Sequence, residues 1–220
     1  MKEKIITIES QLKMPAMQLP IKSTIVSIEN RTVLISPVPH LKKFKDQVEG
    51  LGPITDIVAP NGFHHLGIND AIEMYPDAKL WGVPALKTKR SDINWSHILP
   101  ENWPFQGTLD VIPLLGMPKI DEMIFYLSSE KTLIVSDLFF NHIHGKGFGY
   151  WMVFNMFGTY KRFAVSKFFM KFIKNNQEFK QSLQKILALN IEKIIVSHGE
   201  DVLENAKEKL LMAFKERGLI

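Results

Sequence analysis

The chain has no cysteine among its 220 residues. Disulfide bonds and thiolate metal sites are therefore excluded, so any metal ion would need nitrogen and oxygen ligands. The sequence also has no apolar run of the ~18 residues that a transmembrane helix requires, and residues 1–6 lack the apolar core of a secretion signal. We therefore expect a cytoplasmic protein.

The composition is that of a globular protein. Hydrophobic residues make up 45% of the chain and charged residues 23%, and no low-complexity tract or short repeat interrupts it. A length of 220 residues suits one well-packed core, so we expect residues 1–220 to form a single domain. The net charge of +4 permits an anionic ligand but does not indicate nucleic acid, and no nucleic-acid partner is expected.

Apolar segments alternate with turn signals and amphipathic segments in the order typical of an α/β fold. A loop rich in methionine and proline joins predicted strands at 4–9 and 23–28, and residues 87–106 are expected to be irregular. Asp201 is expected to cap the last helix. The other predicted strands are 32–36, 54–59, 79–83, 109–115, 123–127, 132–136 and 191–197, and the predicted helices are 40–50, 68–75, 177–189 and 201–217.

Polar side chains follow three of the apolar strands. His64 and His65 come after a tight Pro-Asn-Gly loop, and Asp137 and His198 each follow a strand directly. If these strands lie in one layered structure, their ends can meet, and three imidazoles with one carboxylate would suit Zn²⁺, or Fe²⁺ or Mn²⁺ with added water. A structural role stays open at each position, because a histidine at a strand end is often hydrogen-bonded within the fold and Asp137 could cap the next segment.

These motifs resemble those of the metallo-β-lactamase superfamily, whose fold is an αββα four-layer sandwich. The first metal loop of that family reads His-x-His-x-Asp-His-apolar-Gly, and residues 64–67, His-His-Leu-Gly, match its last four positions apart from the aspartate. Residues 136–140 and 196–200 resemble the segments that carry the bridging aspartate and the last histidine. The loop at 60–65 also resembles a bacterial branch in which it reads Pro-Asn-x-x-His-His.

Apart from His64 in place of the aspartate, the departures from the family pattern concern the first of its two metal sites. Pro60 and Gly62 stand where the family has histidines, and the segment around Gly116 supplies no third histidine. The resemblance therefore implies one divalent ion instead of two, with zinc or iron favoured and manganese also compatible. The ligands that it implies are His64, His65, Asp137 and His198.

A single ion at this position indicates a hydrolase-like protein with an unknown small-molecule substrate. Mild basicity points to an anionic ester or phosphoester. The alternative is a non-catalytic metal-binding or membrane-surface protein, because the water that two ions activate together would be lost. The expected accessory residues are Asn61, His142, His144 and Glu200, with His142 and His144 interpreted as histidines of a mobile loop.

Residues 139–176 form a predicted aromatic and basic helical insert. From 138 to 177 the chain has no acidic residue but carries about half of its aromatic residues. Phenylalanines and lysines alternate over 167–174 in a pattern that predicts one apolar and one basic helix face. Such a helix can pack on the core, cover the metal loop as a lid, or contact an anionic membrane peripherally through residues 148–173.

Overall fold

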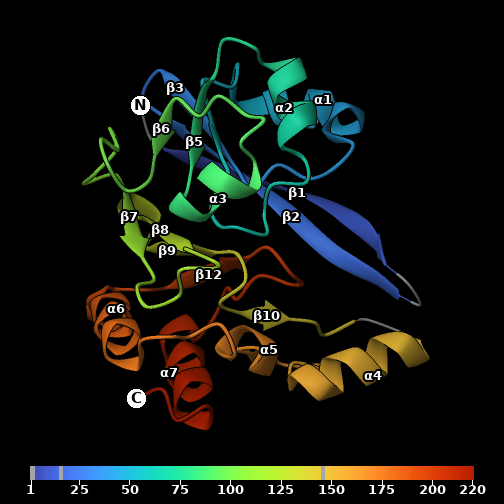
Figure 1. The fold of residues 1–220 in the computed structure, drawn as a ribbon, viewed down its shortest axis with the longest axis vertical. Helices are drawn as coiled ribbons and strands as arrows, with labels where there is room; N and C mark the ends of the chain where they lie inside the picture. The colour runs from blue at the N-terminus through green and yellow to red at the C-terminus, as the bar shows by residue number, and fades with distance from the viewer. Residues whose placement is uncertain (1–2, 15–16, 145–146) are drawn as a thin grey trace.

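The computed structural model describes residues 3–14, 17–144 and 147–220. Two main β-sheets pack together, and helices cover their outer faces (Figure 1). This arrangement confirms the predicted α/β class and its four αββα layers. Among the described residues, no helix has both the length and the apolar character needed to cross a membrane.

The first sheet has the strand order β1-β2-β3-β4-β5-β6. Its first three strands are antiparallel, and β3 to β6 are parallel to one another. Strand β4 ends directly before the Pro60 loop, so this sheet presents the loop at its edge. The strands are β1 (Lys4–Met14), β2 (Met17–Ile28), β3 (Arg31–Ile35), β4 (Asp56–Val58), β5 (Lys79–Gly82) and β6 (His97–Ile98).

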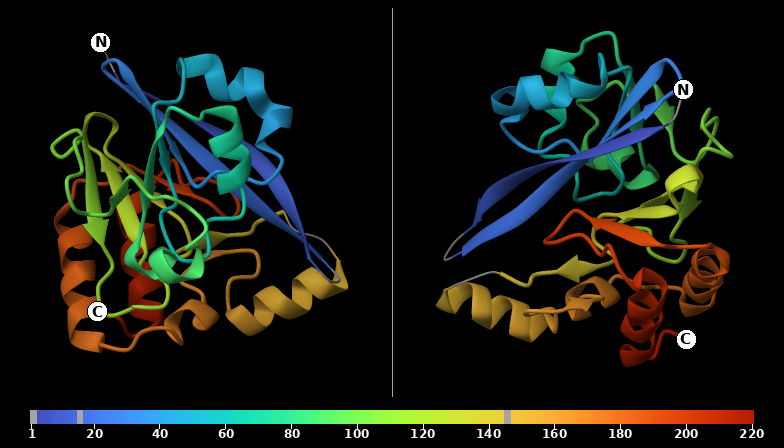
Figure 2. Two further views of the ribbon diagram at one scale, coloured as in Figure 1. Left: turned by 45° about the horizontal axis from the view of Figure 1, so that its top comes forward. Right: turned by 180° about the vertical axis from the view of Figure 1, so that it is seen from behind.

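The β1–β2 hairpin is much longer than the sequence predicts, and Figure 2 shows it projecting from the sheet. The expected loop between residues 9 and 23 is strand, since pairing continues until Met14 lies opposite Met17. Leu12 and Leu19 explain the difference, because they pair across the hairpin and pack against the same core. Residues 15–16 of the predicted loop lie outside the described residues.

The second sheet has the order β12-β9-β8-β7. Its side chains alternate between two cores: Phe125 faces the first sheet, whereas Ile124 and Tyr126 face the helices. Strands β9 and β12 are parallel neighbours, so the residues that follow them emerge at the same edge. The strands are β7 (Leu109–Pro113), β8 (Met123–Leu127), β9 (Thr132–Val135) and β12 (Lys193–Val196).

Helices cover the outer face of each sheet, as the two views of Figure 2 show. The single helix predicted over 40–50 is wrong: three short helical turns form instead, and no side chain caps any of them. The expected irregular segment 87–106 contains the end of α3 and all of β6. The helices are η1 (Leu41–Phe44), α1 (Lys45–Val48), η2 (Glu49–Leu51), α2 (Ile68–Met74), α3 (Pro84–Lys89), η3 (Ser128–Glu130), α6 (Asn176–Ala188) and α7 (Ala206–Glu216).

Asp201 does not cap the last helix, so that prediction is wrong. Helix α7 begins at Ala206, several residues later. Asp201 Oδ1 instead accepts hydrogen bonds from Lys22 Nζ at 2.6 Å and from the backbone N–H of Val196 at 3.3 Å. Its carboxylate therefore ties the β1–β2 hairpin to the end of β12.

The insert is less regular than predicted. The two-faced helix expected over 167–174 shrinks to the four residues of α5, and the longest helix of the insert is α4. Stacking of Phe139 on Phe163 at 4.6 Å and on Phe214 at 5.3 Å anchors the insert to α7. The elements are β10 (Phe140–Asn141), α4 (Phe148–Phe157), β11 (Phe163–Ala164) and α5 (Lys167–Met170).

Candidate metal centre

His64, Asp137 and His198 converge at the edge where the two sheets meet. Their ligand atoms all lie within 4.8 Å of one another. The Nε2 atoms of the two histidines are 3.1 Å apart. Asp137 Oδ2 lies 3.4 Å from His64 Nε2, and Asp137 Oδ1 lies 3.3 Å from His198 Nε2. Three of the four predicted ligands therefore come together in space.

Hydrogen bonds to the outer nitrogens hold both imidazoles in place. His198 Nδ1 lies 2.9 Å from the carbonyl oxygen of Pro20, and His64 Nδ1 lies 2.6 Å from Ser36 Oγ. Because a carbonyl oxygen can only accept, Nδ1 of His198 must carry the proton. In the neutral tautomer that keeps this Nδ1–H, Nε2 would offer a lone pair, as a metal ligand must, and Nε2 is the ring atom that faces His64 and Asp137.

Asn61, an expected accessory residue, joins the loop to the aspartate. Its Oδ1 accepts hydrogen bonds from the backbone N–H groups of Phe63 and His64, both at 2.8 Å. Its Nδ2 donates to Asp137 Oδ2 at 2.7 Å. One fully buried amide thus fixes the turn that carries His64 and orients the carboxylate opposite.

The donor set fits a divalent ion. An ion with ligands at about 2.0–2.1 Å in tetrahedral geometry places neighbouring ligand atoms about 3.3 Å apart. The shortest distances between the three side chains, 3.1, 3.3 and 3.4 Å, are close to that spacing, with the two histidines facing different oxygens of the Asp137 carboxylate. Two imidazole nitrogens with one carboxylate suit Zn²⁺ and Fe²⁺, and Mn²⁺ is also compatible.

Glu122 is a site residue that the sequence did not reveal. It is fully buried just before β8, and its carboxylate accepts hydrogen bonds from the backbone N–H groups of Ser136, Asp137 and Leu138 at 2.9–3.2 Å. Burial, followed by the charge of Asp137, raises the pKa of Glu122 to about 8. The only local signal is an acidic residue placed directly before a wholly apolar strand.

The two buried carboxylates divide the charge between them. Burial opposes ionisation of Asp137, but the facing imidazoles of His64 and His198 outweigh it and hold the pKa of Asp137 well below its usual range. Asp137 therefore stays anionic, as a ligand for a cation must. Glu122 behind it is the member of the pair that accepts a proton first.

Gly62 allows the loop to approach the β7–β8 connection closely. Its N–H donates to the carbonyl of Ile120 at 2.7 Å, and a Cβ atom there would lie 2.9 Å from the carbonyl oxygen of Lys119. A side chain at this position would have to displace backbone. Close backbone packing therefore leaves no room at position 62 for the histidine that the metallo-β-lactamase superfamily has there.

His65 lies outside the group of three. Its Nδ1 is 3.3 Å from Arg90 Nη1, which also donates to the His65 carbonyl oxygen. Burial, followed by the charges of Lys89 and Arg90, lowers the pKa of His65 to about 4. The adjacent histidines thus leave the loop in different directions, and the prediction of His65 as a fourth ligand stays a prediction.

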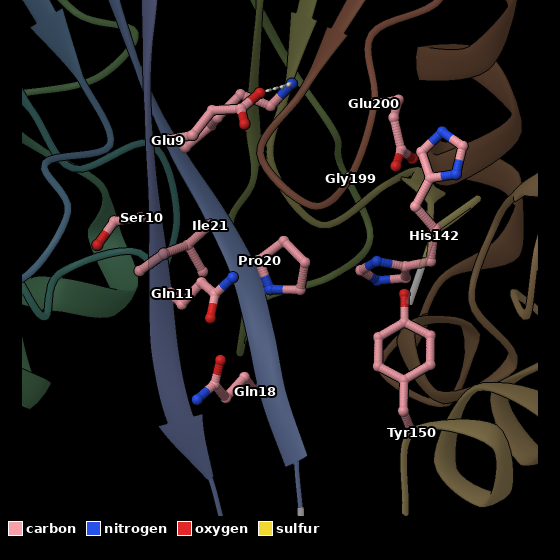
Figure 3. A pocket seen from close by; sticks show the side chains of 12 residues that line it. Glu9, Ser10, Gln11, Gln18, Pro20, Ile21, His142, Tyr150, Gly199 and Glu200 are labelled. Atoms are coloured by element: carbon pink, nitrogen blue, oxygen red, sulfur yellow. Dashed lines mark ion pairs between the residues drawn. The ribbon is translucent and has the colours of Figure 1, made fainter. Parts of the chain in front are cut away.

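The remaining accessory residues line a separate polar cavity of about 540 Å³. In Figure 3, His142 and Tyr150 lie across it from Gln11 and Gln18 of the hairpin. His144 and Glu200 also line it, and Glu200 Oε2 accepts a hydrogen bond from the backbone N–H of Ile143 at 2.9 Å. None of them belongs to the convergent group of ligand atoms among the described residues.

His142 differs from the expected loop histidine because it is buried. Its ring packs 4.0 Å from the ring of Phe154 and 6.5 Å from that of His198, and neither ring nitrogen has a hydrogen-bond partner among the described residues. Burial, followed by the charge of His198, lowers the pKa of His142 to about 3. The side chain is therefore neutral at physiological pH.

This buried histidine should make the fold sensitive to acid. Its pKa is about 3 in the folded protein and near 6.5 in the unfolded chain, so its contribution is full above pH 6.5 and is lost as the pH falls toward 3. Between about pH 6.5 and 4 the wild type should lose about 3 kcal/mol of unfolding free energy through this histidine, and His142→Phe should not show that loss. Urea denaturation at several pH values measures this, and parallel pH profiles would contradict it.

An apolar pocket of about 220 Å³ opens directly onto the three ligands. His64, Asp137, His198 and Ser36 form its polar part. Its walls come from the hairpin, from the turn after β3 and from the loop, namely Leu12, Met14, Leu19, Ile21, Pro37, Val38, Pro39, Phe63 and Leu66. No lysine or arginine is among the described residues that line it.

Comparisons with known proteins give a likeness in structure but not in sequence. No protein-family model and no curated protein matches the chain. A metallo-β-lactamase from Pontibacter korlensis superposes with a TM-score of 0.64 at 13% identity, covering 96% of this chain and 95% of that one. The DIM-1 metallo-β-lactamase superposes with a TM-score of 0.66 at 12% identity, covering 99% and 95%.

A flavodiiron core, Flv1 from Synechocystis, is also similar. Its TM-score is 0.65 at 13% identity, over 96% of this chain and 58% of that one. At these identities the similarity establishes the fold and leaves the activity to the site itself. The strand order, the four layers and these neighbours together show that the chain has the metallo-β-lactamase fold.

Proposed function

We propose that the chain is a metal-dependent hydrolase that holds one divalent ion through His64, Asp137 and His198. The observation that carries the proposal is the convergence of these three donors at the floor of an apolar pocket. Catalytic zinc sites typically use three protein ligands and keep a further position open. A bound ion would supply Lewis-acid polarisation of a carbonyl or phosphoryl oxygen.

The surrounding residues hold the ligands in position. Ser36 and the Pro20 carbonyl fix the two imidazoles, and Asn61 orients the Asp137 carboxylate. Such partners commonly change metal affinity or activity by about 10- to 100-fold when they are removed. The arrangement supports a preorganised site more than a chance cluster of polar groups.

The pocket narrows the proposed substrate class. An apolar group of the substrate would lie against Leu12, Leu19 and Leu66, beside the bond to be hydrolysed. Because the described lining residues include no lysine or arginine, an anionic oxygen would depend mainly on the ion for a counter-charge. We therefore favour an ester with an apolar substituent as the substrate. The anionic ester or phosphoester that the sequence indicates is the second candidate class.

Hydrolysis of p-nitrophenyl esters by the zinc-loaded protein tests the proposal. We expect kcat/KM for the butyrate to exceed that for the acetate by about tenfold beyond their uncatalysed ratio, since each buried methylene contributes about 0.8 kcal/mol. The activity should stop with a chelator and return with zinc. p-Nitrophenyl phosphate, assayed in parallel, tests the phosphoester class.

Two exposed leucines provide the matched comparison. Leu66→Glu places a charge at the pocket mouth and should reduce butyrate hydrolysis by about tenfold. Leu115→Glu changes an exposed leucine that does not line this pocket and should leave the rate unchanged. If the wild type and Asp137→Asn hydrolyse all three compounds equally slowly, the non-catalytic metal-binding alternative holds instead.

A further inference from the structure

Helix α4 carries apolar side chains on both of its sides. Tyr150 and Phe154 are buried and pack together with their ring centroids 4.4 Å apart. On the other side, four large apolar residues are exposed at spacings of three, four and eight, which places them on one face of the helix. This α4 face consists of Phe148 (75% exposed), Trp151 (49%), Met152 (50%) and Met156 (64%).

Neighbouring elements extend the α4 face. Phe168, 43% exposed, stacks on Phe157 at the end of α4 with the ring centroids 5.1 Å apart. Both views of Figure 2 place the far end of the β1–β2 hairpin beside α4, and Met14 near that end is 44% exposed. Contiguous exposed apolar surface of this kind usually marks a contact with a partner or a membrane.

The charged residues of the segment that carries the α4 face all have one sign. Residues 138–177 contain no acidic side chain. Lys161, Lys167, Lys171 and Lys174 are exposed and form no ion pair with any described residue. Lys167 lies against the end of α4, since its Cε atom is 3.2 Å from the place that a Cβ of Gly158 would occupy.

We propose that the α4 face docks on the surface of an anionic lipid bilayer. Aromatic and methionine side chains would enter the boundary between headgroups and acyl chains, and the lysines would lie at the level of the phosphates. A protein partner fits less well, because lysine is depleted in protein–protein interfaces. The proposal does not depend on the metal site, which lies on other elements.

Vesicle flotation of the full-length protein tests this docking. We expect it to float with vesicles that contain phosphatidylglycerol but not with vesicles of phosphatidylcholine alone, and to be released by high salt. The double variant Trp151→Gln with Met152→Gln should bind at least about tenfold more weakly. Both residues are exposed, so the fold should survive, which circular dichroism can verify.

A second double variant controls for the loss of exposed apolar surface in general. Leu203→Gln with Met212→Gln removes two apolar residues that are at least as exposed and lie far along the chain from the α4 face, and it should bind vesicles like the wild type. Equal weakening in both double variants, or no flotation of the wild type with anionic vesicles, overturns the proposal. So does a wild-type dimer that the α4 variant converts to a monomer, because the face would then contact a second copy.

Discussion

Replacing His198 with alanine is expected to lower the affinity of the protein for Zn²⁺ by more than about 100-fold. Even the partners of metal ligands typically contribute 10- to 100-fold to affinity, and His198 supplies a ligand atom directly. Its loss leaves His64 and Asp137 as the only members of the convergent group. Competition with a chromophoric chelator measures the change, and metal analysis of protein purified without chelator gives the stoichiometry.

Two other histidine variants serve as comparisons for His198→Ala. His40→Asn changes an exposed histidine with a left-handed backbone, a conformation that asparagine also tolerates, and should bind zinc like the wild type. His65→Ala decides the number of ligands. Because His65 faces Arg90 in the structure, we expect the variant to retain its zinc. A loss as large as that in His198→Ala would instead restore His65 as a fourth ligand.

The sequence predicts the site best where a functional side chain comes directly after a strand. Asp137 and His198 come after β9 and β12, and the parallel pairing of these strands brings the two side chains together. Short apolar runs followed by a single polar residue are enough to predict such a juxtaposition once an α/β sandwich is assumed. The same logic placed the His64 loop at the same edge.

The sequence predicts the site least well where a side chain's role depends on hydrogen bonds to the backbone of the folded chain. Which of two adjacent histidines turns inward depends on a turn that Asn61 fixes through two backbone hydrogen bonds. Glu122 contacts backbone groups about fifteen residues away in sequence, so no local spacing reveals it. The sequence does not reveal the long hairpin for a related reason: its two strands are stabilised by pairing with each other more than by local propensity.

The ligand residues lie nearest the proposed ion, and the residues that support Asp137 lie behind them. The ligands are on the inner side of the loops, and Asn61 and Glu122 lie behind Asp137, where both are fully buried. A buried carboxylate that accepts several backbone N–H groups resists substitution, because an apolar replacement leaves those donors without partners. Removing the side chains that support Asp137 should therefore lower the stability of the fold as well as the affinity for the metal ion.

Replacing Glu122 with alanine is accordingly expected to destabilise the metal-free protein by about 3 kcal/mol or more. The variant would leave the N–H groups of Ser136, Asp137 and Leu138 buried without an acceptor, at a cost of about 1–3 kcal/mol for each unsatisfied group. Zinc affinity should fall by about 10- to 100-fold at the same time, because Asp137 loses its backbone anchor. Urea denaturation and zinc competition measure the two effects.

Glu122→Gln separates hydrogen bonding from charge and keeps the test informative if the alanine variant does not fold. Glutamine retains one acceptor oxygen for the backbone N–H groups, so we expect a loss of only about 1 kcal/mol. Glu73→Ala, at an exposed glutamate paired with Lys42, should cost less than about 0.5 kcal/mol. If Glu122→Ala and Glu73→Ala were equally stable, Glu122 would not be what holds the Asp137 backbone in place.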